Sequence, residues 1–220
     1  MELDIKGCSF FCSWSGGKDS CLALYRALDN GGVPFTLFTV MNQVSERSHS
    51  HALPISVLRR QAEALQIPLR VRFASWETYE AEFIAELRRL KADGVAVGVF
   101  GDIDIADHRL WEEKVCKAAD MDAYLPLWQE SRLQLVEEFI NLGFIAHIVT
   151  VKDSVLDESY LGRVLDHQLV QDLLSKKVDP AGEAGEFHTV VTAGPVFHHT
   201  VEVTFGPIVK RAGYSFLTCS

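Results

Sequence analysis

The 220-residue sequence lacks three features that would each point to a particular class of protein. Its five cysteines include no Cys-x-x-Cys pair, and their odd number argues against a disulfide framework or a structural zinc site. No apolar run reaches the length of a membrane span. Residues 1–6 carry charges of both signs without the small-residue cleavage site of a signal peptide. We therefore expect a cytoplasmic protein with no membrane partner.

Positive charge is also scarce. Lysine and arginine number 21 against 30 aspartates and glutamates, which gives a net charge of −9 at pH 7. Nucleic-acid-binding surfaces are usually basic, so we do not expect a nucleic-acid partner. The densest basic group is interpreted as one solvated helix face because acidic residues share its helix. It comprises Arg88, Arg89 and Lys91, with Glu80, Glu82 and Glu86.

The segment SGGKDS is the most informative part of the chain. It lies between an apolar run and a helix-like run, which predicts a strand, a glycine-rich turn and a helix N-terminus. Glycines let backbone N–H groups approach an anion, and the helix start and the lysine add positive charge. The serines offer hydroxyl donors, and the aspartate can hold Mg²⁺ against phosphate oxygens. The segment thus predicts a phosphate cradle made of Ser15, Gly16, Gly17, Lys18, Asp19 and Ser20.

This segment is not a Walker A loop, because its second glycine directly follows the first. The pattern S-G-G-x-D-S instead resembles the pyrophosphate loop of the ATP pyrophosphatases. That resemblance implies that the loop grips the β and γ phosphates of ATP, which is split at the α phosphorus into AMP and pyrophosphate. The alternative is an ordinary Gly-Gly turn capped by aspartate or serine.

Strand-like and helix-like runs alternate along the first part of the chain, which predicts an α/β fold with a doubly wound parallel sheet. The expected strands are residues 8–14, 35–41, 69–73, 95–100 and 123–125, and the expected helices are residues 19–30, 53–65, 77–92, 107–119 and 131–142. Ligands of such sheets bind beyond the carboxyl ends of the strands. The phosphate cradle and residues 41–51 and 101–109 follow strands at that edge.

The character of the sequence changes near residue 128, where we place a boundary between an ATP-binding domain, 1–128, and a smaller α+β lobe for the substrate, 129–220. In this lobe we expect a strand at 144–151, a helical stretch at 156–177 and a loop at 179–189. Two strands, 196–205 and 208–217, are expected on either side of Gly206-Pro207. Their edge is where a homodimer would pair.

A second cluster of functional groups lies in the expected loop. Two carboxylates, an imidazole and a hydroxyl fall within the seven residues 183–189, and glycines stand at positions 182 and 185. The carboxylates can accept a proton from an amine or ammonium or hold Mg²⁺, and histidine titrates near neutral pH. The alternative is a solvated acidic turn. The residues are Glu183, Glu186, His188 and Thr189.

Together these motifs resemble the diphthine–ammonia ligase family of ATP pyrophosphatases, which has the adenine-nucleotide α-hydrolase-like fold. The resemblance spans nearly the whole chain. The chain departs from the family pattern at two places. In its motif G-E-x-G-E-F-H-T, His188 replaces the glutamate that usually precedes the threonine, and His108-Arg109 replaces a Gln-Arg pair. This pattern resembles the bacterial branch and leaves the substrate open between diphthine and a corrinoid-type acid. The residues that carry the resemblance are 15–20, 101–103, 108–109, 112, 126–128 and 179–189.

The resemblance implies an ATP-dependent amide ligase that adenylates a carboxylate with Mg²⁺, releases pyrophosphate, and lets ammonia displace AMP. It implies catalytic roles for Lys18, Asp19, Glu183, Glu186 and His188, with Asp19 also a Mg²⁺ ligand. It adds His51, Gly101 and Asp102 to the phosphate cradle as ATP contacts. Substrate contacts would come from His108, Arg109, Glu112, Glu183, Glu186 and Thr189, although a surface ion pair with Glu112 or Glu113 is the alternative for Arg109.

Two other functions compete with amide ligation. A tRNA-modifying pyrophosphatase is disfavoured by the acidic net charge and by the missing cysteine pair. A nucleotide-binding regulatory module without turnover is disfavoured by the second polar loop, which a sensor does not need.

Overall fold

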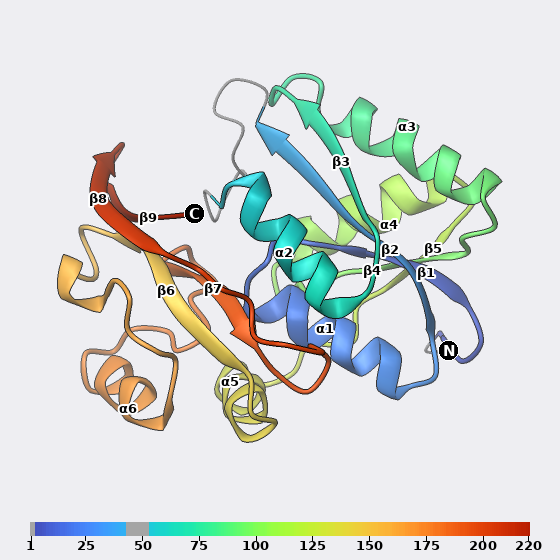
Figure 1. Cartoon of the computed structure of the whole chain (residues 1–220). Helices are drawn as coiled ribbons and strands as arrows, with labels where there is room; N and C mark the ends of the chain where they lie inside the picture. The colour runs from blue at the N-terminus through green and yellow to red at the C-terminus, as the bar shows by residue number, and fades with distance from the viewer. Residues whose placement is uncertain (1–2, 43–52) are drawn as a thin grey trace. The chain divides into compact units, whose positions relative to one another are not determined.

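The computed structural model describes residues 3–42 and 53–220, which divide into two compact units (Figure 1). Among the described residues, the N-terminal unit comprises 3–15, 19–42 and 67–129. The C-terminal unit comprises 16–18, 53–66 and 130–220. Residues 16–18 of the predicted phosphate cradle have most of their contacts within the C-terminal unit.

The N-terminal unit is a five-stranded parallel sheet in the order β3-β2-β1-β4-β5. Helices α3 and α4 cover one face, and α1 lies on the other (Figure 1). The strand order reverses at β1, which confirms the doubly wound fold and puts the ends of β1 and β4 where such sheets bind ligands. The elements are β1 (Ser9–Ser13), α1 (Lys18–Asp29), β2 (Val33–Asn42), β3 (Leu69–Ala74), α3 (Tyr79–Ala92), β4 (Val97–Val99), α4 (Ala106–Ala118) and β5 (Asp122–Tyr124).

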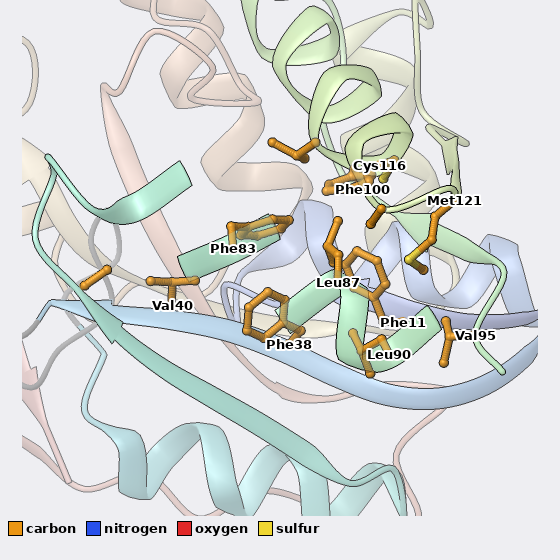
Figure 2. Close-up of a cluster of buried hydrophobic side chains, with 13 residues drawn as sticks. Phe11, Phe38, Val40, Phe83, Leu87, Leu90, Val95, Phe100, Cys116 and Met121 are labelled. Carbon is orange, nitrogen blue, oxygen red and sulfur yellow. The ribbon is translucent and has the colours of Figure 1, made fainter. Parts of the chain in front are cut away.

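Aromatic rings fill the core between this sheet and helices α3 and α4 (Figure 2). Phe11 on the central strand meets the rings of Phe38, Phe83 and Phe100 edge-on, with centroids 5.8–6.3 Å apart. Such edge-to-face contacts add to the free energy gained by burying the rings. A Cβ atom at Gly98 would lie 2.7 Å from the Phe11 ring, so the central strands approach this closely only with glycine there.

The C-terminal unit contains an antiparallel sheet in the order β7-β6-β9-β8, which confirms the expected α+β character. Helices α5 and α6 begin at side-chain caps, because Ser131 and Asp166 accept hydrogen bonds from N–H groups three residues on. The elements are α2 (Ile55–Leu65), α5 (Arg132–Asn141), β6 (Ile145–Lys152), the short 3₁₀ helix η1 (Glu158–Tyr160), α6 (His167–Ser175), β7 (Phe187–Ala193), β8 (Phe205–Arg211) and β9 (Tyr214–Cys219).

Three expectations for this unit are wrong. The stretch 156–177 is not one helix, because residues 162–165 hydrogen-bond along β6 and leave only η1 and α6. The expected loop 179–189 ends early, because β7 begins at Phe187. The final hairpin turns at Ala212-Gly213, both with positive φ, and not at Gly206-Pro207. Pro207 lies inside the edge strand β8, where a missing N–H is tolerated.

Helix α3 also corrects an expectation, because Glu86 is not part of a solvated face. Its side chain is buried and accepts hydrogen bonds from Arg72 (2.6 Å), Arg70 (3.1 Å) and Arg89 (3.1 Å). Burial alone would raise the pKa of Glu86, but these three guanidinium groups outweigh it and hold the pKa below its ordinary value. Glu86 thus joins α3 to strand β3 as an ionised carboxylate.

We predict that Glu86→Gln lowers the free energy of unfolding at pH 7 by about 1–2 kcal/mol, since the arginines remain partly hydrated. A depressed folded-state pKa contributes stability above the unfolded pKa, so the difference from the wild type should shrink below about pH 4.3. Urea unfolding at pH 7 and pH 3.5 measures both effects. Glu82→Gln on the same helix is the control, and an equal loss in the two variants would contradict the prediction.

Candidate functional site

The phosphate cradle connects β1 to α1 through a backbone that only glycine can adopt at Gly16. Its φ is +80°, and a Cβ atom there would lie 2.7–2.8 Å from the side chains of Gln61, Leu53 and Leu58. The side chains of α2 and of the residues before it therefore fit directly against the loop backbone. The glycine is therefore required by this contact and by the positive φ.

Hydrogen bonds fasten this loop to strand β7. The Gln61 side-chain amide is fully buried and donates to the carbonyl oxygens of both Gly16 (2.9 Å) and Val191 (2.8 Å). The Val191 N–H donates to the same Gly16 oxygen at 3.0 Å. The Lys18 N–H donates to the buried hydroxyl of Thr189 at 3.1 Å. The sequence interpretation missed Gln61. Its expectation that Thr189 contacts the substrate stays a prediction, and the structure adds that the Thr189 hydroxyl is hydrogen-bonded to the loop.

The lysine of the loop is also held by β7. Its side chain is almost fully buried, and its Nζ lies 5.8 Å from the centroid of the Phe187 ring. Side chains alternate along a strand, so Phe187 and Thr189 share the face toward Lys18 while His188 lies on the other face. The positive charge of Lys18 is thereby fixed at the N-terminus of α1, where the helix dipole adds to it.

The remaining loop residues place hydroxyl and carboxylate oxygens beside the same helix end. The hydroxyls of Ser15 and Ser20 lie 3.1 Å apart, and Asp19 is in the first turn of α1. Within residues 3–42 and 53–220, no group of three or more His, Cys, Asp and Glu side chains is arranged to hold a metal ion. Asp19 is the carboxylate of the cradle that could hold a Mg²⁺ ion.

A second group of polar residues begins where β4 ends. The Gly101 backbone packs on the cradle, since a Cβ atom there would lie 2.7 Å from the Asp19 carbonyl carbon and 2.9 Å from the Ser20 nitrogen. The next residue, Asp102, has its Oδ1 atom 2.6 Å from Nδ1 of His108. The structure thus brings Gly101, Asp102 and His108 to the cradle within the N-terminal unit.

Glu112 lies behind this pair on α4 with only 4% of its surface exposed. Burial is the largest cause that raises its pKa, to about 11, and the neighbouring Asp102 carboxylate adds to the shift. The pKa of Asp102 moves the other way: burial would raise it, but hydrogen bonds from His108 and Glu112 hold it below the ordinary value. At neutral pH, Glu112 is therefore a neutral acid that donates a hydrogen bond to ionised Asp102.

Arg109 forms a surface ion pair with Glu113, which the sequence left open as the alternative to a substrate contact. Its Nε donates to Oε1 of Glu113 at 2.6 Å, and its guanidinium lies 5.0 Å from the centroid of a Trp128 ring. Both partners of the ion pair are partly exposed.

The acidic loop before β7 is organised by a residue that the sequence interpretation did not single out. Asp179 accepts hydrogen bonds from the N–H groups of Ala181 (3.0 Å) and Glu183 (3.1 Å) and from Arg132 (2.6 Å). The Glu186 carboxylate in turn accepts from the Ala184 N–H at 3.0 Å. An aspartate that opens a Gly-rich turn was the available signal.

One expected ATP contact, His51, lies outside the described residues. Within the described ranges, the helices include none long and apolar enough to cross a membrane.

We predict that Gln61→Met, which keeps the size of the side chain, lowers the free energy of unfolding by about 1–3 kcal/mol, because the carbonyl oxygens of Gly16 and Val191 both lose the buried amide donor. Urea unfolding at pH 7 measures this. The matched control is Gln171→Met on the exposed side of α6. Equal stability of the two variants would show that the bonds from Gln61 do not hold the loop.

Comparison with known proteins finds one family over most of the chain. The family model described as the diphthamide synthase N-terminal domain matches residues 10–123, and the one described as the diphthamide synthase C-terminal domain matches residues 131–216. Proteins named diphthine–ammonia ligase are similar over most of this chain. The human protein is 27% identical and the rat protein 29% identical, each over 92% of this chain and 85% of its own length. The Saccharomyces cerevisiae protein is 26% identical over 86% of this chain and 33% of its own length.

The two family models cover the segment that carries the phosphate cradle and the segment that carries the acidic loop. Each match falls on a part of the chain whose geometry has been described above. The chain belongs to the diphthamide synthase family.

Proposed function

We propose that this protein is an ATP-dependent ligase that converts a carboxylate and ammonia into an amide, with AMP and pyrophosphate as the other products. The observation that carries the proposal is the cradle itself, where a glycine-lined backbone, a helix N-terminus and a buried Lys18 converge. The names of the similar proteins support the choice of ammonia as the nucleophile.

In the first step, the cradle binds the β and γ phosphates of ATP. Backbone N–H groups and the hydroxyls of Ser15 and Ser20 donate to phosphate oxygens, and Lys18 offsets the charge of the departing pyrophosphate. A Mg²⁺ ion held by Asp19 would supply further positive charge there. An oxygen of the substrate carboxylate attacks the α phosphorus, the bond to pyrophosphate breaks, and an acyl-adenylate forms.

In the second step, ammonia attacks the acyl carbon and displaces AMP. Glu183 and Glu186 bind ammonium, and His188 on the following strand passes its proton on. Within the C-terminal unit this loop leads directly into β7, whose first residues contact Lys18. The acidic loop is thus tied in sequence and in hydrogen bonding to the residue that grips ATP.

The acid is proposed to be diphthine or a corrinoid-type acid, held with the help of Arg109. In this proposal, residues 1–128 bind ATP, residues 129–220 bind the acid, and His51 contacts the nucleotide. The edge strand β8 is where a cytoplasmic homodimer would form.

We predict that the protein catalyses ATP–pyrophosphate exchange with Mg²⁺ when the correct acid is present, in a panel that includes diphthine-bearing elongation factor two and corrinoid acids. Lys18→Ala should lower the exchange rate about 10²-fold or more, because the leaving pyrophosphate loses its buried cation. Formation of ADP and phosphate in place of AMP and pyrophosphate would overturn the proposal.

We also predict that Glu183→Gln together with Glu186→Gln leaves acid-dependent exchange intact and lowers amide formation by about 10²-fold or more, because ammonium loses its binding groups. Both reactions are measured on one preparation, with Glu202→Gln as the control. A regulatory module would show no amide formation in either protein. Loss of exchange along with amide formation would contradict the assignment of these carboxylates to the second step.

A further inference from the structure

Three titratable groups are connected at the end of β4 in the N-terminal unit: His108, Asp102 and Glu112. The first contact, between Asp102 Oδ1 and His108 Nδ1, is 2.6 Å long. The second is the hydrogen bond between Glu112 and Asp102, in which Glu112 is the donor. The segment that carries them packs on the phosphate cradle through the backbone of Gly101.

The three groups become more exposed in order from Glu112 to His108. Glu112 is 4% exposed, and its Oε2 atom is buried with no hydrogen-bond partner among the described residues. The Asp102 side chain is 27% exposed and the His108 side chain 55%. Ligand access is therefore at the imidazole, while the two carboxyl groups are behind it.

The surroundings of Glu112 favour its neutral form. The phenol of Tyr79 on α3, the carboxylate of Glu113 and the thiol of Cys116 on α4 all interact with it, and none is a cation. Ionising Glu112 would place two negative charges side by side in a buried site, which is costly. The negative charge of the group therefore belongs to Asp102, which accepts from Glu112 on one side and from His108 on the other.

A carboxylate that accepts from Nδ1–H fixes a histidine in the tautomer whose Nε2 can accept a proton. The guanidinium of the neighbouring Arg109 does not give up its proton in proteins, so His108 is the residue of the pair that can take a proton.

We infer that His108 is the base of the amide-forming step and that Asp102 and Glu112 are its positioning residues. This inference rests on the proposed function and adds a group that takes a proton from the reacting nitrogen.

Two protons leave the nitrogen as ammonium becomes an amide. The first is lost when ammonium becomes ammonia, which the acidic loop is proposed to assist. Ammonia then forms a C–N bond to the acyl carbon, and the carbonyl electron pair moves to oxygen. Nε2 of His108 takes the second proton from the positively charged nitrogen. The carbonyl re-forms, and the C–O bond to AMP breaks with its electron pair on the phosphate oxygen.

Hydroxylamine separates this role from substrate binding. It is a much weaker base than ammonia, so the nitrogen of its adduct loses a proton to water without help from the protein. With His108→Gln we expect acid-dependent ATP–pyrophosphate exchange and hydroxamate formation to remain near wild-type rates. Amide formation from ammonium should fall by about 10²-fold or more. An equal fall for both nucleophiles, or no fall for either, would overturn the inference.

The positioning roles have their own test in kcat for amide formation. Glu112→Gln keeps the shape and can still donate an N–H to Asp102, so it should retain most of the activity. Glu112→Leu and Asp102→Asn remove the donor and the charge, and each should lower kcat with little change in the KM for ATP. If Glu112→Gln is as inactive as Glu112→Leu while both remain folded, Glu112 acts as a charged ligand and the inference is wrong.

These outcomes are distinguishable from failure of the proposed function. If the wild type shows no acid-dependent exchange with any acid, the ligase proposal itself fails. If the wild type exchanges and the His108 variant forms amide at the wild-type rate, the ligase proposal stands and only the base assignment fails.

Discussion

The structure depends on the buried neutral groups that hold the phosphate cradle, the loop proposed to bind ATP, in its conformation. Gly16 has no side chain, and its carbonyl oxygen accepts from the amide of Gln61 and from the backbone of Val191. In a buried site these bonds gain strength from the low dielectric, and each would be expensive to leave unmade. The inward-facing carbonyl of Gly16 is therefore satisfied by neutral donors, with no charged group needed there.

Burying a polar side chain costs free energy unless it is hydrogen-bonded or uncharged, and three buried residues of this chain meet that constraint differently. Gln61 is neutral and makes two hydrogen bonds. Glu86 keeps its charge because three arginines surround it. Glu112 is buried beside another carboxylate, so it keeps its proton. Burial alone does not decide the charge of a carboxyl group, because the neighbouring groups determine whether the ionised or the protonated form has the lower free energy.

Much of the fold could be predicted from the sequence, and the reasons are local. Continuous apolar runs and the Gly-Gly turn at residues 16–17 predicted the parallel sheet and the start of α1, which the structure confirms. The extent of α6 and the position of the last hairpin turn could not be predicted in the same way. Pairing of residues 162–165 with β6 overrides helical periodicity, and Pro207 stands in a strand because that strand is an edge.

Segments 15–20 and 183–189 could be proposed as parts of the site from the sequence, because each carries several functional groups, and their roles stay predictions. The site was not predictable where a group acts through a partner far along the chain. Gln61 reaches Val191, and Arg132 reaches Asp179, and neither spacing leaves a periodic signal. A polar residue on the otherwise apolar face of α2 was the signal available for Gln61.

The alternation of side chains along β7 limits how this protein can change during evolution. Phe187 and Thr189 meet Lys18 only because they lie two residues apart on one face. Inserting one residue after Phe187 would turn His188 toward Lys18 and move the threonine to the opposite face. Insertions before Phe187 would only lengthen the acidic loop. Length variation among relatives should therefore accumulate on the loop side of Phe187 and stop where the strand begins.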